Sequence, residues 1–359
     1  MAIVEHPTKT GTLSSWQHSL KIAFRDSWQL LKFLGLASEP APLVANDAGS
    51  NLDSNGKSRH LYSDIGSIQE SPFALFVTRE FASRMRKSDW NDPLLRQVWV
   101  DAKEEIVTPG YLKDPVGDSK TELAPGLLHK YHGRVLLVMT GACAIHCRYC
   151  FRRHYPYSSA PKSIDEWEPA LDAIEADNSI QEVILSGGDP LSIVDSVLSQ
   201  LLDRLAKIPH LKRLRIHTRF PIVIPSRITS RFIDILSDSR LSKWIVLHIN
   251  HANEIDDEVY QAVDRMRRSG AILLNQSVLL EGINNDIDSL VTLSEKLINA
   301  NILPYYLHQL DPVQSAAHFE VPVAKGKQLV VEMAKRLPGF AVPKYVYEKS
   351  GEPNKTLIY

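Results

Sequence analysis

The chain has 359 residues, a formal net charge of −1 at pH 7 and only 3 cysteines. A near-neutral chain has no general basic field, which argues against a nucleic-acid-binding protein. Its N-terminus lacks the basic and apolar regions of a signal peptide, and no uncharged apolar run approaches the ~20 residues that span a bilayer. Three clustered thiols cannot form a paired disulfide framework. These features predict a cytoplasmic protein with no membrane partner.

The first part of the chain, residues 1–110, is predicted to form a mainly helical extension. Apolar residues at helical spacing predict one amphipathic helix over 13–36, and further helices are expected at about 73–86 and 92–98. Residues 38–66 are rich in turn formers and are expected to form a loop or linker. The extension carries no chemical signature.

From Arg134 onward, apolar β-branched runs alternate with amphipathic segments, which predicts a parallel sheet covered by helices. The predicted strands are 134–139, 182–186, 213–217, 244–249, 271–276 and 302–308, and the predicted helices are about 164–177, 192–207, 225–237, 254–269, 286–300 and 323–336. No G-x-G-x-x-G run follows the first strand. The pattern therefore favours an α/β fold with a partial (β/α)6 barrel at 111–340, followed by a C-terminal segment at 341–359.

Polar groups follow each predicted strand, although an apolar core would exclude them. They are Cys143, the run Ser186 to Asp189, His217, Arg219, His248, Asn250, Gln276, Gln309 and Asp311. Each could by itself be a satisfied interior polar residue. Because barrel enzymes build their sites at the carboxyl ends of the strands, together these groups predict a single site at the barrel mouth.

All three cysteines, Cys143, Cys147 and Cys150, lie in one C-x3-C-x2-C loop. Thiolates are ligands of iron–sulfur clusters and of zinc, and three of them would leave one iron of a [4Fe–4S] cluster open. His146 or His154 could instead complete a Cys3His zinc site. The spacing favours the cluster, because zinc sites more usually show paired C-x2-C units. A non-catalytic zinc-binding regulatory protein is the alternative.

The cysteine spacing, followed by Phe151, resembles the cluster-binding loop of the radical S-adenosylmethionine (SAM) enzymes. The resemblance implies a [4Fe–4S] cluster whose open iron binds SAM, and whose electron splits SAM to a 5′-deoxyadenosyl radical. The glycines after the second strand would let backbone approach a ligand closely, with the adjacent aspartate free to accept hydrogen bonds. The SAM-binding residues that the resemblance implies are Ser186, Gly187, Gly188, Asp189, His248 and Gln276.

Ordered blocks from about Pro72 to Lys355 resemble the lysine 2,3-aminomutase family, and in particular its short bacterial branch that serves elongation factor P. The blocks include Pro125-Gly-Leu-Leu-His-Lys-Tyr131, the cysteine loop and His248-Ile-Asn-His-Ala-Asn-Glu254. The resemblance implies pyridoxal 5′-phosphate (PLP) as a further cofactor. It implies conversion of L-lysine to (R)-β-lysine, which a partner ligase attaches to elongation factor P, and an electron donor such as flavodoxin. A homo-oligomer is compatible with the sequence.

By position, the resemblance also implies the roles of individual residues. Lys355 matches the lysine that bonds PLP, and Lys130 and Tyr131 match residues around the PLP phosphate. On their own, both lysines would be interpreted as solvated side chains. The substrate-binding residues are Arg152 for the carboxylate and Asp311 and Glu348 for the ε-ammonium.

The two acidic positions decide between possible substrates. Two carboxylates at the side-chain end would repel a glutamate, so Asp311 and Glu348 favour lysine. A glutamate or other amino-acid 2,3-aminomutase is the alternative within the family.

Overall fold

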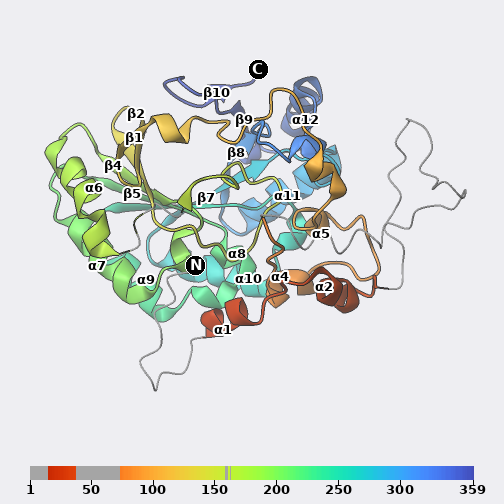
Figure 1. The fold of residues 1–359 in the computed structure, drawn as a ribbon, viewed down its shortest axis with the longest axis horizontal. Helices are drawn as coiled ribbons and strands as arrows, with labels where there is room; N and C mark the ends of the chain where they lie inside the picture. The colour runs from red at the N-terminus through yellow and green to blue at the C-terminus, as the bar shows by residue number, and fades with distance from the viewer. Residues whose placement is uncertain (1–14, 38–72, 158–160, 162) are drawn as a thin grey trace, which may run out of the picture.

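The computed structural model describes residues 15–37, 73–157, 161 and 163–359. Its centre is one 10-stranded sheet in which the strands follow chain order from β1 to β10. From β3 to β9 neighbouring strands run parallel, whereas β1 and β2 at one edge and β10 at the other run antiparallel to their neighbours. Figure 1 shows helices flanking this sheet. The arrangement confirms the predicted α/β fold with a partial barrel.

The strands and helices have the following bounds. The strands are β1 (Glu122–Ala124), β2 (Leu127–Tyr131), β3 (Arg134–Val138), β4 (Glu182–Ser186), β5 (Arg213–Thr218), β6 (Ser242–Leu247), β7 (Ile272–Val278), β8 (Leu303–His308), β9 (Lys344–Tyr347) and β10 (Thr356–Leu357). The α-helices are α1 (Ser15–Lys21), α2 (Ser27–Leu34), α4 (Arg79–Ser83), α5 (Pro93–Arg96), α6 (Ile164–Ala176), α7 (Asp195–Ala206), α8 (Phe220–Val223), α9 (Ser230–Asp238), α10 (Asp257–Arg268), α11 (Ile287–Asn299) and α12 (Val323–Arg336).

Four strands at the two edges of the sheet were not predicted. β1 and β2 form a hairpin whose turn, Pro125-Gly126, needs the positive φ of 73° that glycine adopts without strain. At the other edge β9 continues the parallel order beside β8, and β10 folds back on β9. These short strands matter for function because Lys130 and Tyr131 end β2, while Glu348 follows β9 and Lys355 precedes β10.

The prediction of a single helix over 13–36 is wrong for its described part, which forms α1 and α2. Between them Phe24 pairs with Val77 in an isolated β-bridge, and the Asp26 side chain caps α2 by accepting from the Gln29 amide. The predicted helix at 73–86 shortens to α4, because Thr78 caps it and the preceding backbone pairs with Phe24. The linker predicted at 38–66 lies outside the described residues.

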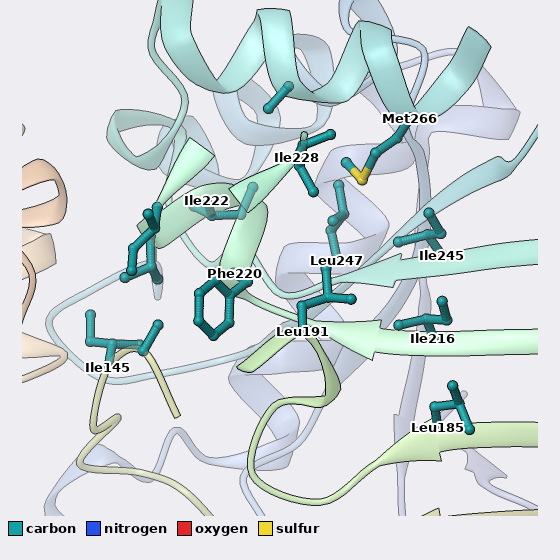
Figure 2. Packing of buried hydrophobic residues seen from close by; sticks show 14 of the residues in the cluster. Ile145, Leu185, Leu191, Ile216, Phe220, Ile222, Ile228, Ile245, Leu247 and Met266 are labelled. Carbon is teal, nitrogen blue, oxygen red and sulfur yellow. The ribbon is translucent and has the colours of Figure 1, made fainter. Parts of the chain in front are cut away.

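Buried apolar side chains of the N-terminal helices and of the barrel form one continuous core. Trp16 of α1 packs edge-on against Phe220 of α8, with ring centroids 5.8 Å apart. Figure 2 shows Phe220 in the same cluster as Ile216 and Leu247, which come from β5 and β6. Each such burial stabilises the fold by about 1.5–3 kcal/mol. The N-terminal helices thereby support the segment that follows β5, which borders the site. No helix in the described ranges is both long and apolar enough to cross a membrane.

Candidate active site

A single cavity of about 690 Å³ is lined by all the residues that were predicted to bind the cofactors and the substrate. Asn250 and Gln309, which were also expected at the mouth, do not line it: Asn250 Nδ2 donates to the Tyr149 hydroxyl, and Gln309 Nε2 donates to the Val321 carbonyl oxygen. Its wall is built by the carboxyl ends of the parallel strands, the cysteine loop after β3, the end of β2 and the segment around β10. A volume of this size is typical of small-molecule and cofactor sites. The prediction that the strand ends meet at one mouth is therefore correct in its geometry.

The three thiols of the cysteine loop lie close to one another. Burial raises the pKa of Cys143 and raises that of Cys150 to about 11, and the charge of Cys147 adds to both shifts. Ligand binding must therefore displace protons from these thiols. No three His, Cys, Asp or Glu side chains in the described ranges converge as one metal ion requires. Thiolates of a [4Fe–4S] cluster bind separate irons, so the three thiols need not meet at one point to hold it.

The two histidines that could have completed a zinc site have other contacts. His146 places Nδ1 2.7 Å from the Ala74 carbonyl oxygen, and its ring stacks on Phe73 with centroids 4.6 Å apart. His154 directs Nε2 to the Gln314 carbonyl oxygen at 3.4 Å. The donor set therefore fits the cluster and gives no support to the Cys3His alternative.

The two glycines after β4 allow the backbone of the cysteine loop to pack closely against them. Gly187 has a φ of 116°, and a Cβ on Gly188 would lie 2.5 Å from the Ala142 carbonyl oxygen. The Gly188 amide donates to the Thr140 carbonyl oxygen at 2.7 Å, and the next amide donates to that of Ala142 at 2.8 Å. The close approach predicted for a ligand is in this structure an approach of loop backbone.

The expectation that Asp189 is free to accept hydrogen bonds is wrong. Its side chain is buried, and Oδ1 accepts from the Thr218 hydroxyl and the Leu191 amide at 2.7 and 3.0 Å. Oδ2 accepts from the amides of Arg219 and Phe220 at 2.7 and 3.1 Å. A carboxylate has about four acceptor positions, so this one is saturated. Burial still raises its pKa to about 6. The side chain pins the end of β4 to the end of β5.

His248 and Gln276 occupy neighbouring positions at the cavity wall. His248 Nδ1 lies 2.9 Å from the Gln276 carbonyl oxygen, and Nε2 lies 2.8 Å from the Tyr149 hydroxyl. Burial, with a further contribution from Arg219, lowers the pKa of His248 to about 4, so the ring is neutral. The side-chain oxygen of Gln276 is buried without a hydrogen-bond partner within the described ranges. That oxygen can accept from a bound molecule.

A chain of alternating charges joins β2, the cysteine loop and the segment after β9. Asp118 accepts a hydrogen bond from Arg152 Nε at 2.7 Å and forms an ion pair with Lys130 Nζ at 2.6 Å. Lys130 also contacts Glu348 at 3.1 Å, and Glu348 in turn pairs with Lys355. Arg152 donates a further hydrogen bond to the Ser186 hydroxyl. Sequence reasoning missed Asp118, because it lies 34 residues from Arg152 and no local spacing signals the contact.

This network sets the charge states of its carboxylates. Burial alone would raise the pKa of Asp118, but Arg152 and Lys130 together lower it below its ordinary value. The pKa of Glu348 is also lowered, because the positive charges of Lys355 and Lys130 outweigh the effect of burial. Both groups are therefore carboxylates at neutral pH.

Asp311 differs from the other acids of the cavity. Its Oδ1 is buried and has no hydrogen-bond partner within the described ranges. Burial, reinforced by the negative charge of Glu348, raises the pKa of Asp311 to about 7. An unpaired buried carboxylate is costly, and a cationic ligand would relieve that cost.

A cationic region suited to phosphate borders Tyr131. The Arg134 guanidinium lies over the Tyr131 ring, 4.8 Å from its centroid. Burial raises the pKa of Tyr306, and the positive charges of Arg215 and Arg134 act in the opposite direction. These groups share the cavity with the amine of Lys355, so the residues present fit PLP, which needs an amine for its aldehyde and cations for its phosphate. Sequence reasoning missed both arginines.

Comparison with known proteins agrees with this donor set. Residues 137–292, which include the cysteine loop and β4 to β7, match the model of the radical SAM superfamily. The chain is 48% identical to L-lysine 2,3-aminomutase of Escherichia coli (strain K12) over 97% of this chain and 95% of that protein. It is 46% identical to the protein of that name from Haemophilus influenzae, over 79% of this chain and 84% of that protein.

A solved structure of a radical SAM methyltransferase from Sphaerobacter thermophilus is more distant. Its TM-score is 0.44 at 17% identity, covering 62% of this chain and 68% of that chain. The superfamily match and the three-cysteine loop define a radical SAM protein. The identity and coverage of its relatives go further: the chain belongs to the lysine 2,3-aminomutase family. The match to the Escherichia coli protein extends well beyond Pro72 toward the N-terminus, where the sequence alone gave no convincing resemblance.

Family membership confirms the predicted enzyme class and cofactors. The protein is an isomerase that uses a [4Fe–4S] cluster, SAM and PLP. The roles of individual residues toward these groups stay predictions, because the structure holds the residues alone.

Proposed function

We propose that this protein is an L-lysine 2,3-aminomutase that converts L-lysine to (R)-β-lysine. The observation that carries the proposal is the Asp311 carboxyl, whose Oδ1 is buried without a hydrogen-bond partner within the described ranges and which feels the negative charge of Glu348. A substrate that brings a positive charge to this end of the cavity relieves the repulsion between the two acids, whereas glutamate would add to it. The names of the relatives supply independent support.

Arg152 is proposed to bind the substrate carboxylate. Its Nε donates a hydrogen bond to Asp118 and its Nη1 donates one to Ser186, while Nη2 makes no hydrogen bond to another described residue. The Asp118 contact raises the pKa of Arg152 despite its burial, so the guanidinium stays charged. A fixed, charged fork with a spare nitrogen suits a carboxylate.

Lys355 and Glu348 are proposed to exchange partners when PLP and substrate bind. The Lys355 amine must lose its proton before it can react with an aldehyde, and the carboxylate of Glu348 lies next to it. If PLP were bonded to Lys355, that lysine would offer Glu348 no ammonium, and Glu348 could then pair with the ε-ammonium of an incoming lysine. When the substrate amine takes the place of Lys355 on PLP, the Lys355 amine would be released within reach of the same carboxylate.

When bound, the cluster and SAM supply the radical that removes a substrate hydrogen, and PLP supplies the conjugated system that carries the migrating amino group. The chain's own contribution is to hold the substrate at both ends and to exclude water from the cavity. We further propose that a flavodoxin-type donor supplies electrons, that a ligase transfers the product to elongation factor P, and that the protein works in the cytoplasm, where thiols stay reduced.

The test is anaerobic incubation of the reconstituted enzyme with SAM, a reductant, PLP and L-lysine, with β-lysine detected by mass spectrometry on a chiral column. Parallel reactions replace lysine by glutamate or omit PLP. We expect (R)-β-lysine with lysine and no product with glutamate. Conversion of glutamate but not of lysine would overturn the substrate assignment.

The zinc alternative is tested on the same preparation. Purified anaerobically, a cluster protein is brown, and bound PLP absorbs in the near-visible. Colourless protein with one zinc per chain would favour a metal-binding regulatory protein.

A further inference from the structure

Arg219, the first residue after β5, is a buried cation that contacts the cysteine loop directly. Its Nη1 lies 2.7 Å from the Cys147 sulfur and 2.9 Å from the Tyr149 hydroxyl. Its Nη2 donates to Gln97 Oε1 at 2.6 Å and to Glu254 Oε2 at 2.8 Å. One terminal nitrogen therefore faces the loop, and the other faces a buried acid.

Glu254 fixes the orientation of this guanidinium. It is fully buried, and its Oε1 accepts from the amides of Asn250 and His251 at 2.9 and 3.1 Å. With Oε1 held by backbone, Oε2 is placed to receive Arg219. The pair is neutral as a whole, so a charged guanidinium can be kept at this depth. A lysine ammonium, as a point charge, could not span both the acid and the sulfur in the same way.

The chain before the barrel holds the cysteine loop from the opposite side. The Gln97 carbonyl accepts from the Arg148 amide at 2.9 Å, and the Phe76 carbonyl accepts from the His146 amide at 3.0 Å. Gln97 thus contacts the loop through its backbone and Arg219 through its side chain. The Cys147 region is consequently fixed between the N-terminal segment and the end of β5.

We propose that Arg219 is a positioning residue for the iron–sulfur cluster: it donates a charged hydrogen bond to the Cys147 sulfur, holds that ligand in place and raises the reduction potential of the cluster. Reduction adds negative charge to the cluster, and a donor on a ligating sulfur stabilises that charge. Within the described ranges no arginine side chain donates to Cys143 or Cys150, so the effect acts on one of the three ligands.

The experiment is a redox titration of the reconstituted enzyme, without lysine or PLP, followed by electron paramagnetic resonance of the reduced cluster. The main variant combines Arg219→Gln with Glu254→Gln, which leaves no buried charge unpaired. We expect the ratio of reduced to oxidised cluster at a fixed solution potential to fall about tenfold, which is a shift of 59 mV for a one-electron couple. Arg219→Lys should shift the ratio in the same direction by less.

The matched control combines Arg227→Gln with Asp195→Asn. Arg227 is also fully buried and pairs with Asp195 at 2.7 Å, but within the described part of the chain it forms no hydrogen bond with a cysteine. The control should lose stability and keep the wild-type potential.

Each outcome bears on the proposal. A lowered potential supports it, as does failure to load the cluster in protein whose circular dichroism is native while the control loads normally. An unchanged potential in the main variant overturns it, and so does an equal shift in the control. If the main variant does not fold, Arg219→Lys decides by the same criterion. The inference needs the proposed site's cluster but not its substrate, so the titration remains informative if the lysine assignment fails.

Discussion

The two sides of the cavity treat charge in different ways. On the cluster side, which comprises Cys143, Cys147, Cys150, Arg219 and Glu254, the buried Arg219 guanidinium has fixed partners in the Glu254 carboxylate and the Cys147 sulfur. On the substrate side, which comprises Asp118, Lys130, Asp311, Glu348 and Lys355, the buried Oδ1 of Asp311 has no hydrogen-bond partner within the described ranges, and Lys355, the proposed PLP lysine, is paired with Glu348. Paired buried charges suit a cluster that stays bound. A buried carboxyl oxygen without a partner suits a cationic ligand that binds and dissociates.

The largest effect is expected from Lys355→Ala on the substrate side. Without the amine there is no covalent anchor for PLP, so β-lysine formation should fall by about a thousand-fold or more. Lys349→Ala is the control, since that lysine is exposed and its ion pair is with Glu352 alone among described residues. Product assays and the near-visible PLP absorbance check both variants. A Lys355→Ala protein with normal absorbance and turnover would contradict the proposed role.

Asp311→Asn removes the unmet charge while keeping the side chain's size. Because losing one partner of a buried charge pair costs about 2–5 kcal/mol, kcat/KM for lysine should fall by about 100-fold. The free protein should nevertheless become more stable at pH 8, since a carboxyl whose pKa is raised by burial destabilises the fold once it is ionised. Thermal unfolding and kinetics measured together separate this outcome from simple misfolding, in which both quantities decline.

Gly188→Ala tests the tight packing beneath the cluster side. The new Cβ would lie 2.5 Å from the Ala142 carbonyl oxygen, so the cysteine loop must shift. We expect a loss of about 1–3 kcal/mol in the free energy of unfolding and reduced iron content. Gly339→Ala is the control, because a Cβ there meets no atom within 4 Å. Full iron loading and unchanged stability in the Gly188 variant would be incompatible with this packing argument.

The pH dependence of lysine turnover gives the smallest effect. Asp311, with a pKa of about 7, is neutral below that pH and then cannot balance the ε-ammonium. On the acid side kcat/KM should therefore fall by about tenfold per pH unit. Measurements between pH 6 and 8 test this, and Asp311→Asn should remove the inflection. A flat wild-type profile would mean that Asp311 does not meet the substrate.

The sequence predicts the parallel wall and the cluster loop because their signals are local. Most of the six strands from β3 to β8 contain a short apolar run, β5 alternates polar and apolar residues, and the cysteine loop is defined by spacing alone. Of the edge strands, β1 and β10 are too short to give a pattern, at 3 and 2 residues. The break between α1 and α2 was missed because Phe24 pairs with the distant Val77.

Contacts between distant residues account for most of what the sequence did not show in the site. Lys130 and Glu348 are 218 residues apart, and Arg219 and Cys147 are 72 apart. Such pairs arise only when the sheet brings its strand ends together. For Asp189 the sequence predicted a contact that the structure does not show. Its motif suggested that it binds a ligand, but its four hydrogen bonds are all made to other residues of the chain.

That saturated aspartate has a consequence for anyone who redesigns the enzyme. A library aimed at new amino-acid substrates should hold Asp189 constant even though it lines the cavity. Its replacement would leave buried backbone amides after β4 and after β5 without a hydrogen-bond acceptor. Diversity belongs instead at Asp311, whose buried Oδ1 has no hydrogen-bond partner within the described ranges, and where the proposed substrate assignment predicts that altering the charge changes which amino acid binds.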